Sequence, residues 1–458
     1  MSDQSDLATE NAAARPDTFR FGGFTLSPDE GVLALHYGFE GGPEFTERLD
    51  FHTGFADRPP ETLAVIERAA HLLSAVAGVS YYKLFASQNL DFGALELSEQ
   101  ARSFVADTYR AGLAEFAHRA GLSLADRLKF SGGSETAALG ETGSLTKDKS
   151  LVLIGGGKDS LVSLAAMQAA GEDFALFAVN PRDPMTNAAE VAGVPLLRVT
   201  RSLDPLLFEW NEKPGTYNGH VPITAIVSLI ACVAALVHGY GNVILSNERS
   251  ADEPTLTNAD GEVNHQYSKS TAFERDFASV IAADVHPELA YFSLLRPLSE
   301  AHIARTFAKR DDFDRVFTSC NRAFALRNRP DTLWCGDCAK CRFTFLLLAP
   351  HMAKERLLSI FPANLLDDPA QEAGFRDLMG IGLHKPWDCV GEERESALTL
   401  ATLARDPAWK DAAIVRKLAA ELNVSDEELA RGMDELMAPE PAPLPDHFCD
   451  LIAAYAAG

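Results

Sequence analysis

The sequence has few basic residues for its acidity and length. Its 458 residues include 41 lysines and arginines against 65 aspartates and glutamates, which gives a formal net charge of −24. Such a charge repels polyanions, so we expect no nucleic acid as a partner. Cysteine is scarce as well, with seven in the chain. This excludes a disulfide framework and predicts a reduced, cytoplasmic compartment.

The sequence also lacks a segment typical of a signal or membrane anchor. Residues 1–18 have no basic region followed by an apolar core, and we expect them to form a disordered tail. The longest uncharged apolar run, residues 221–237, approaches the length of a membrane span, but Pro222, Thr224 and Ser228 keep its hydrophobicity modest. We therefore expect a helix buried against a sheet, and no membrane partner.

Short apolar runs and helical segments alternate from residue 150 to residue 245. Strands are predicted over 151–154, 174–179, 196–199 and 243–245, and helices over 159–170, 187–192 and 224–237. This order predicts an α/β fold built on a doubly wound parallel sheet.

The flanking regions have different patterns and suggest further structural units. Residues 19–147 predict an N-terminal α+β domain, with a small antiparallel sheet over 19–55, helices over 59–128 and a polar linker from 132 to 149. The doubly wound domain then covers 148–310, a cysteine-rich element 311–360, and a helical C-terminal region 361–458. A proline-rich hinge at 439–445 interrupts that last region.

A glycine-rich loop, GGGKDS, follows the strand over 151–154 and opens the next helix. It consists of Gly155, Gly156, Gly157, Lys158, Asp159 and Ser160. Three glycines let backbone N–H groups turn inward, and the helix N-terminus adds partial positive charge, so the loop predicts a phosphate site. It is neither a Walker loop nor a dinucleotide fingerprint. A simple tight turn is the alternative interpretation.

Polar residues follow two other predicted strands of the sheet. Asn180, Pro181 and Arg182 come after the strand 174–179, and residues 246–250 (SNERS) follow 243–245. Ligands bind at the carboxyl ends of strands in doubly wound folds, so Asn180 is a candidate for cofactor binding. Glu248 is a candidate to bind magnesium or position a substrate amine, or else belongs to a helix N-cap.

Four cysteines have the spacing of a metal site. Cys335, Cys338 and Cys341 are separated by two residues each, and Cys320 lies upstream as a fourth ligand. Four thiolates fit a closed tetrahedral site, so we expect structural Zn²⁺. An iron–sulfur cluster, a redox pair and unliganded thiols are the alternatives.

The other three cysteines stand apart from this cluster. Cys232, Cys389 and Cys449 have no such spacing, and we expect them to be packing residues.

The glycine-rich loop resembles the SGGxDS loop of the PP-loop ATP pyrophosphatases. Gly155 stands where that family has serine, while Lys158, Asp159 and Ser160 match. The resemblance implies a HUP-like fold over 148–310 and cleavage of ATP between its α and β phosphates. The lost hydroxyl at Gly155 leaves a backbone N–H as the replacement donor.

Further segments resemble the bacterial UDP-N-acetylmuramoyl-L-alanyl-L-glutamate epimerase (MurL) family. They are 217–222 (YNGHVP), 264–270 (NHQYSKS), 295–300 (LRPLSE) and 334–342 (WCGDCAKCR), together with 155–160 and 246–250. The resemblance extends from about residue 19 to about residue 388. It implies an ATP- and Mg²⁺-dependent conversion of the terminal L-glutamate of a UDP-linked peptidoglycan precursor to D-glutamate, with release of AMP and pyrophosphate.

The implied chemistry is physically reasonable. A carboxylate acidifies its neighbouring C–H poorly, because deprotonation would place two negative charges together. An acyl-adenylate removes one of those charges, so that a modest base suffices.

Inversion of a stereocentre is most simply performed by two acid–base groups. His220 and His265 lie in polar segments expected at strand ends, and histidine titrates near neutral pH. They are the predicted pair, with structural hydrogen bonding as their alternative role. Tyr267, Lys269 and Glu274 are further candidates, and Lys269 also suits an acidic substrate.

Two other functions remain open from the sequence. One is a PP-loop ligase that forms an amide or nitrile, as in 7-deazaguanine synthesis, or a thiolating enzyme. The other is a nucleotide-sensing regulator with a degenerate loop, suggested by Gly155.

Overall fold

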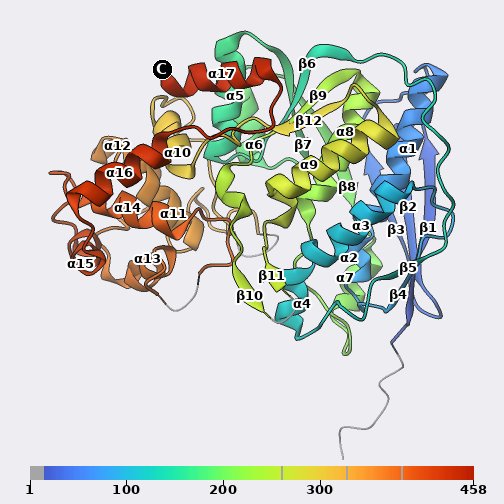
Figure 1. Cartoon of the computed structure of the whole chain (residues 1–458), viewed down its shortest axis with the longest axis horizontal. Helices are drawn as coiled ribbons and strands as arrows, with labels where there is room; N and C mark the ends of the chain where they lie inside the picture. Colours follow the sequence, from blue (N-terminus) through green and yellow to red (C-terminus); the bar gives the residue numbers. More distant parts are fainter. Residues whose placement is uncertain (1–14, 259–260, 326–328, 383–384) are drawn as a thin grey trace, which may run out of the picture.

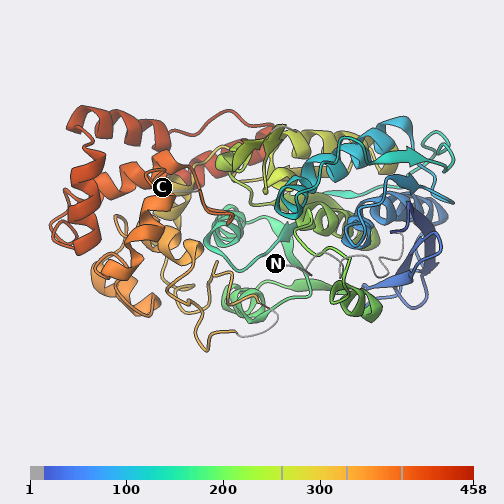
Figure 2. The same ribbon diagram turned by 90° about the horizontal axis from the view of Figure 1, so that it is seen from below.

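The computed structural model describes residues 15–258, 261–325, 329–382 and 385–458. Most of the predicted tail over 1–18, namely residues 1–14, lies outside the described residues. The first strand begins at Thr18. The molecule is elongated, with N-terminal strands at one end and C-terminal helices at the other (Figures 1 and 2).

One ten-stranded sheet forms the centre of the fold. Its strands, in spatial order, are β12 (Ala290–Ser293), β9 (Tyr240–Leu245), β6 (Thr146–Leu153), β7 (Asp173–Val179), β8 (Leu196–Ser202), β3 (Glu44–Asp50), β2 (Val32–Phe39), β1 (Thr18–Ser27), β4 (Asn89–Asp91) and β5 (Lys129–Ser131). Strands from β12 to β8 are parallel to one another. The predicted α/β class with a largely parallel sheet is confirmed.

Helices cover both faces of the parallel strands, because these strands bury side chains on both sides. Leu151 of β6 packs in one core and its neighbour Val152 in the other. The first core takes in α1 (Pro60–Ala77), α2 (Val79–Tyr82), α3 (Glu99–Gly112), α8 (Ile223–His238) and α9 (Thr271–Val280). The second takes in α5 (Lys158–Ala170), α6 (Asp183–Ala192), α10 (Glu300–Ala308) and α17 (Asp446–Ala457).

The strands β1, β2 and β3 form the antiparallel sheet predicted for the N-terminal region. Buried and more exposed residues alternate along β2 and β3, as expected for strands with one face on a core. This small sheet is continuous with the central one, because β3 pairs with β8 in antiparallel register from Arg48–Ser202 to Asp50–Thr200. The division of the chain into domains stays a prediction.

Shorter elements complete the fold, and some of them carry site residues. They are α4 (Ala114–Ala120), α7 (Pro205–Asn211), the hairpin of β10 (Leu256–Asn258) and β11 (Gly261–Val263), and the single turns η1 (Arg249–Asp252), η2 (Tyr267–Lys269) and η3 (Ile281–Val285).

The C-terminal region is helical, as predicted. It contains α11 (Ala339–Leu348), α12 (Lys354–Ile360), η4 (Pro369–Gln371), α13 (Glu372–Leu378), α14 (Glu393–Leu403), α15 (Ala413–Leu422) and α16 (Asp426–Met437). Residues 439–445 interrupt it without regular structure, and α17 then returns to pack on α5 beside the central sheet (Figure 1).

Two apolar segments pack inside the protein. By length and composition the run Pro60–Tyr82 would suffice to cross a membrane, but two thirds of its most apolar stretch is buried in the fold. The apolar run over 221–237 forms α8, whose side chains fill the core between the sheet and α1. The predicted buried helix is confirmed.

A buried ion pair joins the N-terminal strands to the parallel strands. The Arg201 guanidinium on β8 donates to both carboxylate oxygens of Glu47 on β3, over 2.7 and 3.0 Å, and also to Ser80 Oγ at 2.9 Å. Glu47 is fully buried. Loss of either partner leaves an uncompensated charge in the interior.

Glu47→Ala is therefore expected to lower the free energy of unfolding by about 3–5 kcal/mol. Urea unfolding followed by circular dichroism measures this change. The matched control is Glu44→Ala, because Glu44 lies exposed on the same strand. Equal stability of the two variants would contradict the role assigned to the ion pair.

Candidate functional site

The glycine-rich loop connects the end of β6 to the first turn of α5. Gly156 has φ +79°, a left-handed conformation that favours glycine, and a Cβ atom there would lie 2.9 Å from Pro184 Cβ. The Gly155 N–H donates to Ser160 Oγ over 3.3 Å, and that hydroxyl donates to the Gly157 carbonyl over 3.0 Å. The hydroxyl therefore fixes the turn of the loop.

Gly155 lies in open space, in contrast to Gly156. No described atom lies within 4 Å of a Cβ built at Gly155. The serine of the PP-loop pattern would fit there without displacing a neighbour. Packing therefore does not explain why this chain has glycine instead of serine at position 155.

A cavity of about 360 Å³ lies beside the loop, at the carboxyl ends of β6, β7 and β9. Asp159, Ser160 and Lys269 contribute polar groups to its wall. The remaining lining residues include Gly155, Gly157, Phe177, Val179, Thr224, Leu245, Ser246, Asn247, Thr318, Ser319 and Lys340. This is the position at which doubly wound folds bind ligands.

Lys158 is turned away from this cavity. Its ammonium group contacts Asp159 Oδ1 at 2.5 Å and the carboxylate of Glu300 on α10, and only 2% of the residue is exposed. Burial disfavours the charged form, but the two carboxylates outweigh burial and raise the pKa of Lys158. Phosphate binding by Lys158 stays a prediction.

Asn180 lies at a second cavity, of about 530 Å³, together with His52, Arg182 and Arg198. Its side chain joins β7 to β8: Nδ2 donates to the Arg201 carbonyl over 2.8 Å, and Oδ1 accepts from the Arg201 N–H over 2.9 Å. The structure thus gives Asn180 a positioning role at the strand ends, and its contact with a cofactor stays a prediction.

Glu248 is buried and caps the turn η1, where its carboxylate accepts a hydrogen bond from the Ser250 N–H. Burial and the charge of Asp159 raise the pKa of Glu248, although the hydrogen bond from Ser250 opposes this. The N-cap interpretation therefore fits the geometry, except that the carboxylate is buried instead of solvated. Glu248 interacts electrostatically with Asp159, and its role in Mg²⁺ binding stays a prediction.

The two predicted histidines belong to one polar cluster, the histidine cluster, which consists of Glu115, His220, His265, Lys269 and Cys389. His220 Nδ1 lies 3.3 Å from Glu115 Oε2 on α4. Burial lowers the pKa of His220 to about 4, and the nearby positive charges of His265 and Lys269 add to this effect. His265 is buried, and its Nδ1 is paired with Thr255 Oγ1 at 2.6 Å.

The three further candidates are placed differently. Lys269 lines the loop cavity and lies in the histidine cluster. Tyr267 packs against Phe273, and Glu274 is paired with Arg296 at 2.8 Å in the interior. Lys269 is thus the candidate that borders both the cavity and the cluster.

Sequence reasoning missed two members of this cluster, Glu115 and Cys389. Cys389 was expected to be a packing residue, but Lys269 Nζ donates to its sulfur over 3.3 Å. Burial raises the pKa of a thiol, yet the Lys269 ammonium and the His265 imidazole reverse the effect and lower the pKa of Cys389 to about 5. No spacing signal marks Cys389, because its partners lie more than a hundred residues away.

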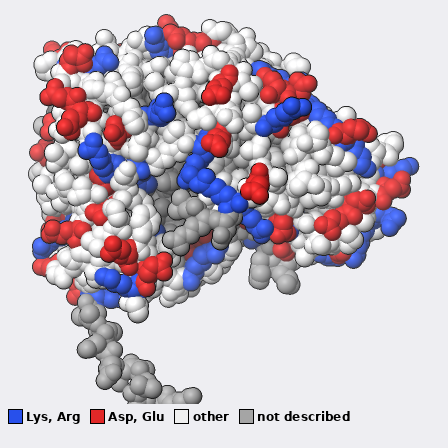
Figure 3. All heavy atoms as spheres, turned by 180° about the vertical axis from the view of Figure 1, so that it is seen from behind, with Lys and Arg blue, Asp and Glu red and all other residues white. Residues whose placement is uncertain are grey.

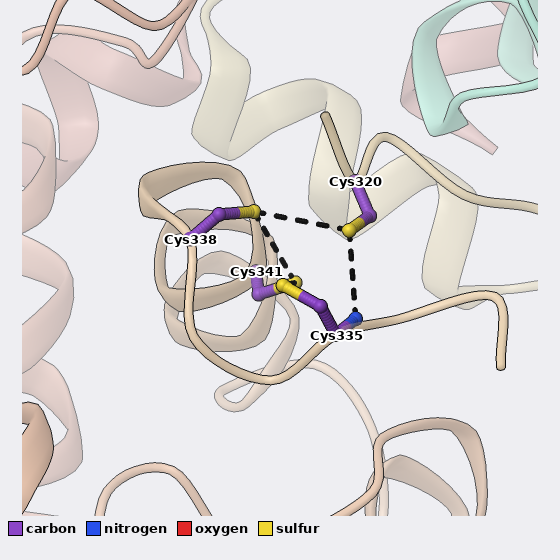
Figure 4. Close-up of side chains that lie close together, drawn as sticks. All are labelled: Cys320, Cys335, Cys338 and Cys341. Carbon is purple, nitrogen blue, oxygen red and sulfur yellow. Dashed lines mark hydrogen bonds between the residues drawn. The ribbon is translucent and has the colours of Figure 1, made fainter. Parts of the chain in front are cut away.

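The four clustered cysteines converge on one point (Figure 4). Their sulfur atoms all lie within 4.8 Å of one another, with separations of 3.5 Å for Cys338–Cys341, 3.7 Å for Cys335–Cys341 and 3.9 Å for Cys338–Cys320. Zn–S bonds of about 2.3 Å at tetrahedral angles place sulfurs about 3.8 Å apart. The donor set therefore fits a tetrahedral metal ion.

This cysteine cluster is close to the glycine-rich loop. The Thr318 N–H donates to the Gly156 carbonyl over 2.9 Å, and the Thr318 hydroxyl accepts from the Cys320 N–H over 3.0 Å. A metal ion held by Cys320 would thus stabilise the segment that supports the loop.

Comparison with known proteins identifies the family of this chain. The family model for the MurL N-terminal domain matches residues 10–294, and that for the MurL C-terminal domain matches residues 316–432. The chain belongs to the MurL family. The resemblance inferred from the motifs is confirmed.

Three relatives have been given the same name, UDP-N-acetyl-alpha-D-muramoyl-L-alanyl-L-glutamate epimerase. The protein of Xanthomonas oryzae pv. oryzae is 41% identical over 429 residues, which are 92% of this chain and 94% of the relative. That of Micromonospora sp. is 42% identical over 409 residues, 88% of this chain and 90% of the relative. That of Salinispora tropica is 41% identical over 409 residues, 88% of each chain.

Both MurL domains contribute to the site. The glycine-rich loop and the two histidines lie in the first, while the four clustered cysteines and Cys389 lie in the second. The polar cluster is therefore complete only when the two domains are assembled.

The loop geometry gives a first test within the MurL site. Gly155→Ser is expected to leave stability unchanged, whereas Gly156→Ser should cost at least about 1–2 kcal/mol, because φ is positive and Pro184 is close. Thermal unfolding of the two variants measures the difference. Equal loss of stability in both would contradict the geometry described for this loop.

The cysteine cluster gives a second test. Cys338→Ser is expected to abolish stoichiometric metal binding and to lower the melting temperature, since one of four ligands is lost. Metal analysis of the purified proteins measures this, with Cys449→Ser as the control because Cys449 lies outside the cluster. The same metal content in both variants would exclude the assigned ligand set.

Proposed function

We propose that this protein converts the terminal L-glutamate of UDP-MurNAc-L-Ala-L-Glu to D-glutamate, in peptidoglycan precursor synthesis in the cytoplasm. ATP would activate the carboxylate as an acyl-adenylate, and AMP and pyrophosphate would be released. The names of the three relatives support the substrate and the epimerisation. The glycine-rich loop supports ATP as the activating reagent and a PP-loop, HUP-like arrangement of the parallel strands.

One observation carries the proposal: Lys269 borders both the loop cavity and the histidine cluster. Adenylation needs a phosphate site, and inversion needs acid–base groups near the same carbon. Because Lys269 belongs to both, the proposed phosphate site and the proposed acid–base groups are neighbours. His220 and His265 are the proposed acid–base groups.

The acidic groups near the loop suit Mg²⁺. Asp159 lines the cavity, and it interacts electrostatically with the buried carboxylates of Glu248 and Glu300. Carboxylate oxygens are the ligands that Mg²⁺ takes together with substrate phosphates. When bound, the ion would neutralise charge on those phosphates. For the cysteine cluster we propose Zn²⁺ with a structural role.

A larger cavity suits the rest of the substrate. It has a volume of about 950 Å³, and its lining includes the basic residues Lys83 and Arg201, His220 and the acidic residues Glu209 and Glu212. Burial lowers the pKa of Lys83 to about 8, so near neutral pH its ammonium form predominates and can pair with an anionic group of the substrate. The volume lies in the range of pockets that bind small molecules.

The net charge of −24 supports a small-molecule substrate over nucleic acid, because it repels polyanions. On the face shown in Figure 3, acidic and basic side chains are interspersed.

The proposal is tested with ATP, Mg²⁺ and UDP-MurNAc-L-Ala-L-Glu in deuterium oxide. We expect D-glutamate that carries deuterium at its α-carbon, with AMP formed alongside, because proton removal and return exchange with solvent. Chiral analysis and mass spectrometry of the glutamate measure the result. Without ATP the glutamate should remain L.

An unchanged precursor, with the protein folded and metal-loaded, would overturn the epimerase proposal. Consumption of ammonia or sulfur together with AMP release would favour the PP-loop ligase instead.

A further inference from the structure

The segment over 385–390 enters the polar cluster and is fixed there by its aromatic residue. The Trp387 ring stacks on His118 with 5.6 Å between centroids and meets His265 edge to face at 6.3 Å. The Arg119 guanidinium lies 4.9 Å from the centre of the same ring. Cys389 therefore follows a well-anchored residue.

Two polar contacts hold the same segment from other sides. Lys385 Nζ pairs with Glu253 Oε2 at 2.5 Å, and Asn321 Nδ2 donates to Asp388 Oδ1. Glu253 follows η1 and Asn321 follows Cys320, so the segment is tied to both MurL domains.

The surroundings of this thiol are charged. Lys269 Nζ donates to the sulfur over 3.3 Å, and His265, Lys340 and Glu115 interact with it electrostatically. His265 Nδ1 is paired with Thr255 Oγ1, and the His265 side chain also stabilises the Cys389 thiolate through a hydrogen bond. The thiolate is therefore held between a lysine and a histidine.

Cys232 provides the comparison with a packing cysteine. It is fully buried in α8 among apolar residues, and burial alone raises the pKa of its thiol. Cys389 has the opposite shift: burial raises the pKa of this thiol as well, but Lys269 and His265 outweigh burial and favour the thiolate, and the residue as a whole is partly exposed. These are the properties of a reactive cysteine.

We propose that the Cys389 thiolate, held by Lys269 beside His265, is one of the two groups that exchange the α-proton of the activated glutamate. This inference rests on the epimerisation proposed above. Lys269 lines the loop cavity and contacts the sulfur, so the thiolate is one side chain away from the place where the carboxylate would be activated. In this refinement Cys389 takes the acid–base role assigned above to His265, and Lys269 and His265 position the thiolate.

The step balances without a further reagent. The thiolate removes the α-proton, so that an S–H bond forms, the C–H bond breaks and the electron pair is delocalised onto the activated carbonyl. A water molecule positioned by His220, which lines the larger cavity and is neutral because burial lowers its pKa to about 4, returns a proton to the opposite face. The hydroxide left behind takes the proton of the Cys389 thiol, so that water and thiolate are both restored.

The inference predicts that Cys389→Ala and Cys389→Ser separate two activities. In deuterium oxide with ATP, Mg²⁺ and the precursor, we expect AMP formation to persist while inversion and α-deuterium incorporation fall by about 10²–10⁴-fold. Cys449→Ser is the matched control and should behave as the wild type.

The outcomes distinguish this inference from the proposed function. Inversion at the wild-type rate by the Cys389 variants would overturn the inference alone. An unreacted precursor with the wild type would overturn the proposed function and, with it, the inference.

Alkylation of the wild type provides a readout that depends neither on turnover nor on the folding of the Cys389 variants. With metal-loaded wild type, iodoacetamide labelling of Cys389, mapped by mass spectrometry, should reach half its maximal rate near pH 5 instead of the pH of about 8.5 of an ordinary thiol. Lys269→Gln should move this midpoint upward. A midpoint near 8.5 in the wild type would contradict the ion pair.

Discussion

The buried ammonium group of Lys158 constrains the whole centre of the structure. A charge in the interior costs several kcal/mol unless it is paired, so the first turn of α5 must remain against the Glu300 carboxylate of α10. The next residue, Ala301, donates its N–H to Glu395 on α14 over 3.1 Å. Through these contacts the glycine-rich loop, the end of the sheet and the C-terminal helices form one network. The loop is therefore held in shape before any ligand arrives.

The same assembly explains why the candidate site draws on both MurL domains. The first supplies the glycine-rich loop, His220, His265 and Lys269, while the second supplies the cysteine cluster and Cys389. With Cys389 as a proposed proton-transfer group, the groups for activation and inversion are divided between the two domains. Lys269 links them, because it lines the loop cavity and binds the Cys389 sulfur. In this account carboxylate activation and proton transfer are neighbouring events in one site.

Local features of this protein could be predicted from its sequence, whereas long-range pairings could not. The strand before Gly155, the glycine-rich loop and the cysteine spacing each follow from adjacent residues, and the structure places them as expected. The strands β3 and β8 pair across a long stretch of chain, and the buried Glu47 and Arg201 that meet there are 154 residues apart. Lys269 and Cys389 are 120 residues apart, so no sequence spacing predicts their contact either. The spacing of apolar and turn residues predicts which segments are buried and where the chain turns, but it does not predict which charged residues far apart in the sequence form ion pairs.

The central claim is that the carboxylate is activated by transfer of AMP to one of its oxygens. It is tested most directly with precursor whose glutamate carboxylates carry oxygen-18, incubated with ATP and Mg²⁺ in unlabelled water. The account predicts that the AMP released acquires an oxygen-18 atom from the substrate, because the acyl-adenylate bridges through a carboxylate oxygen and water attacks the carbonyl carbon. Inversion of the glutamate with unlabelled AMP would contradict it.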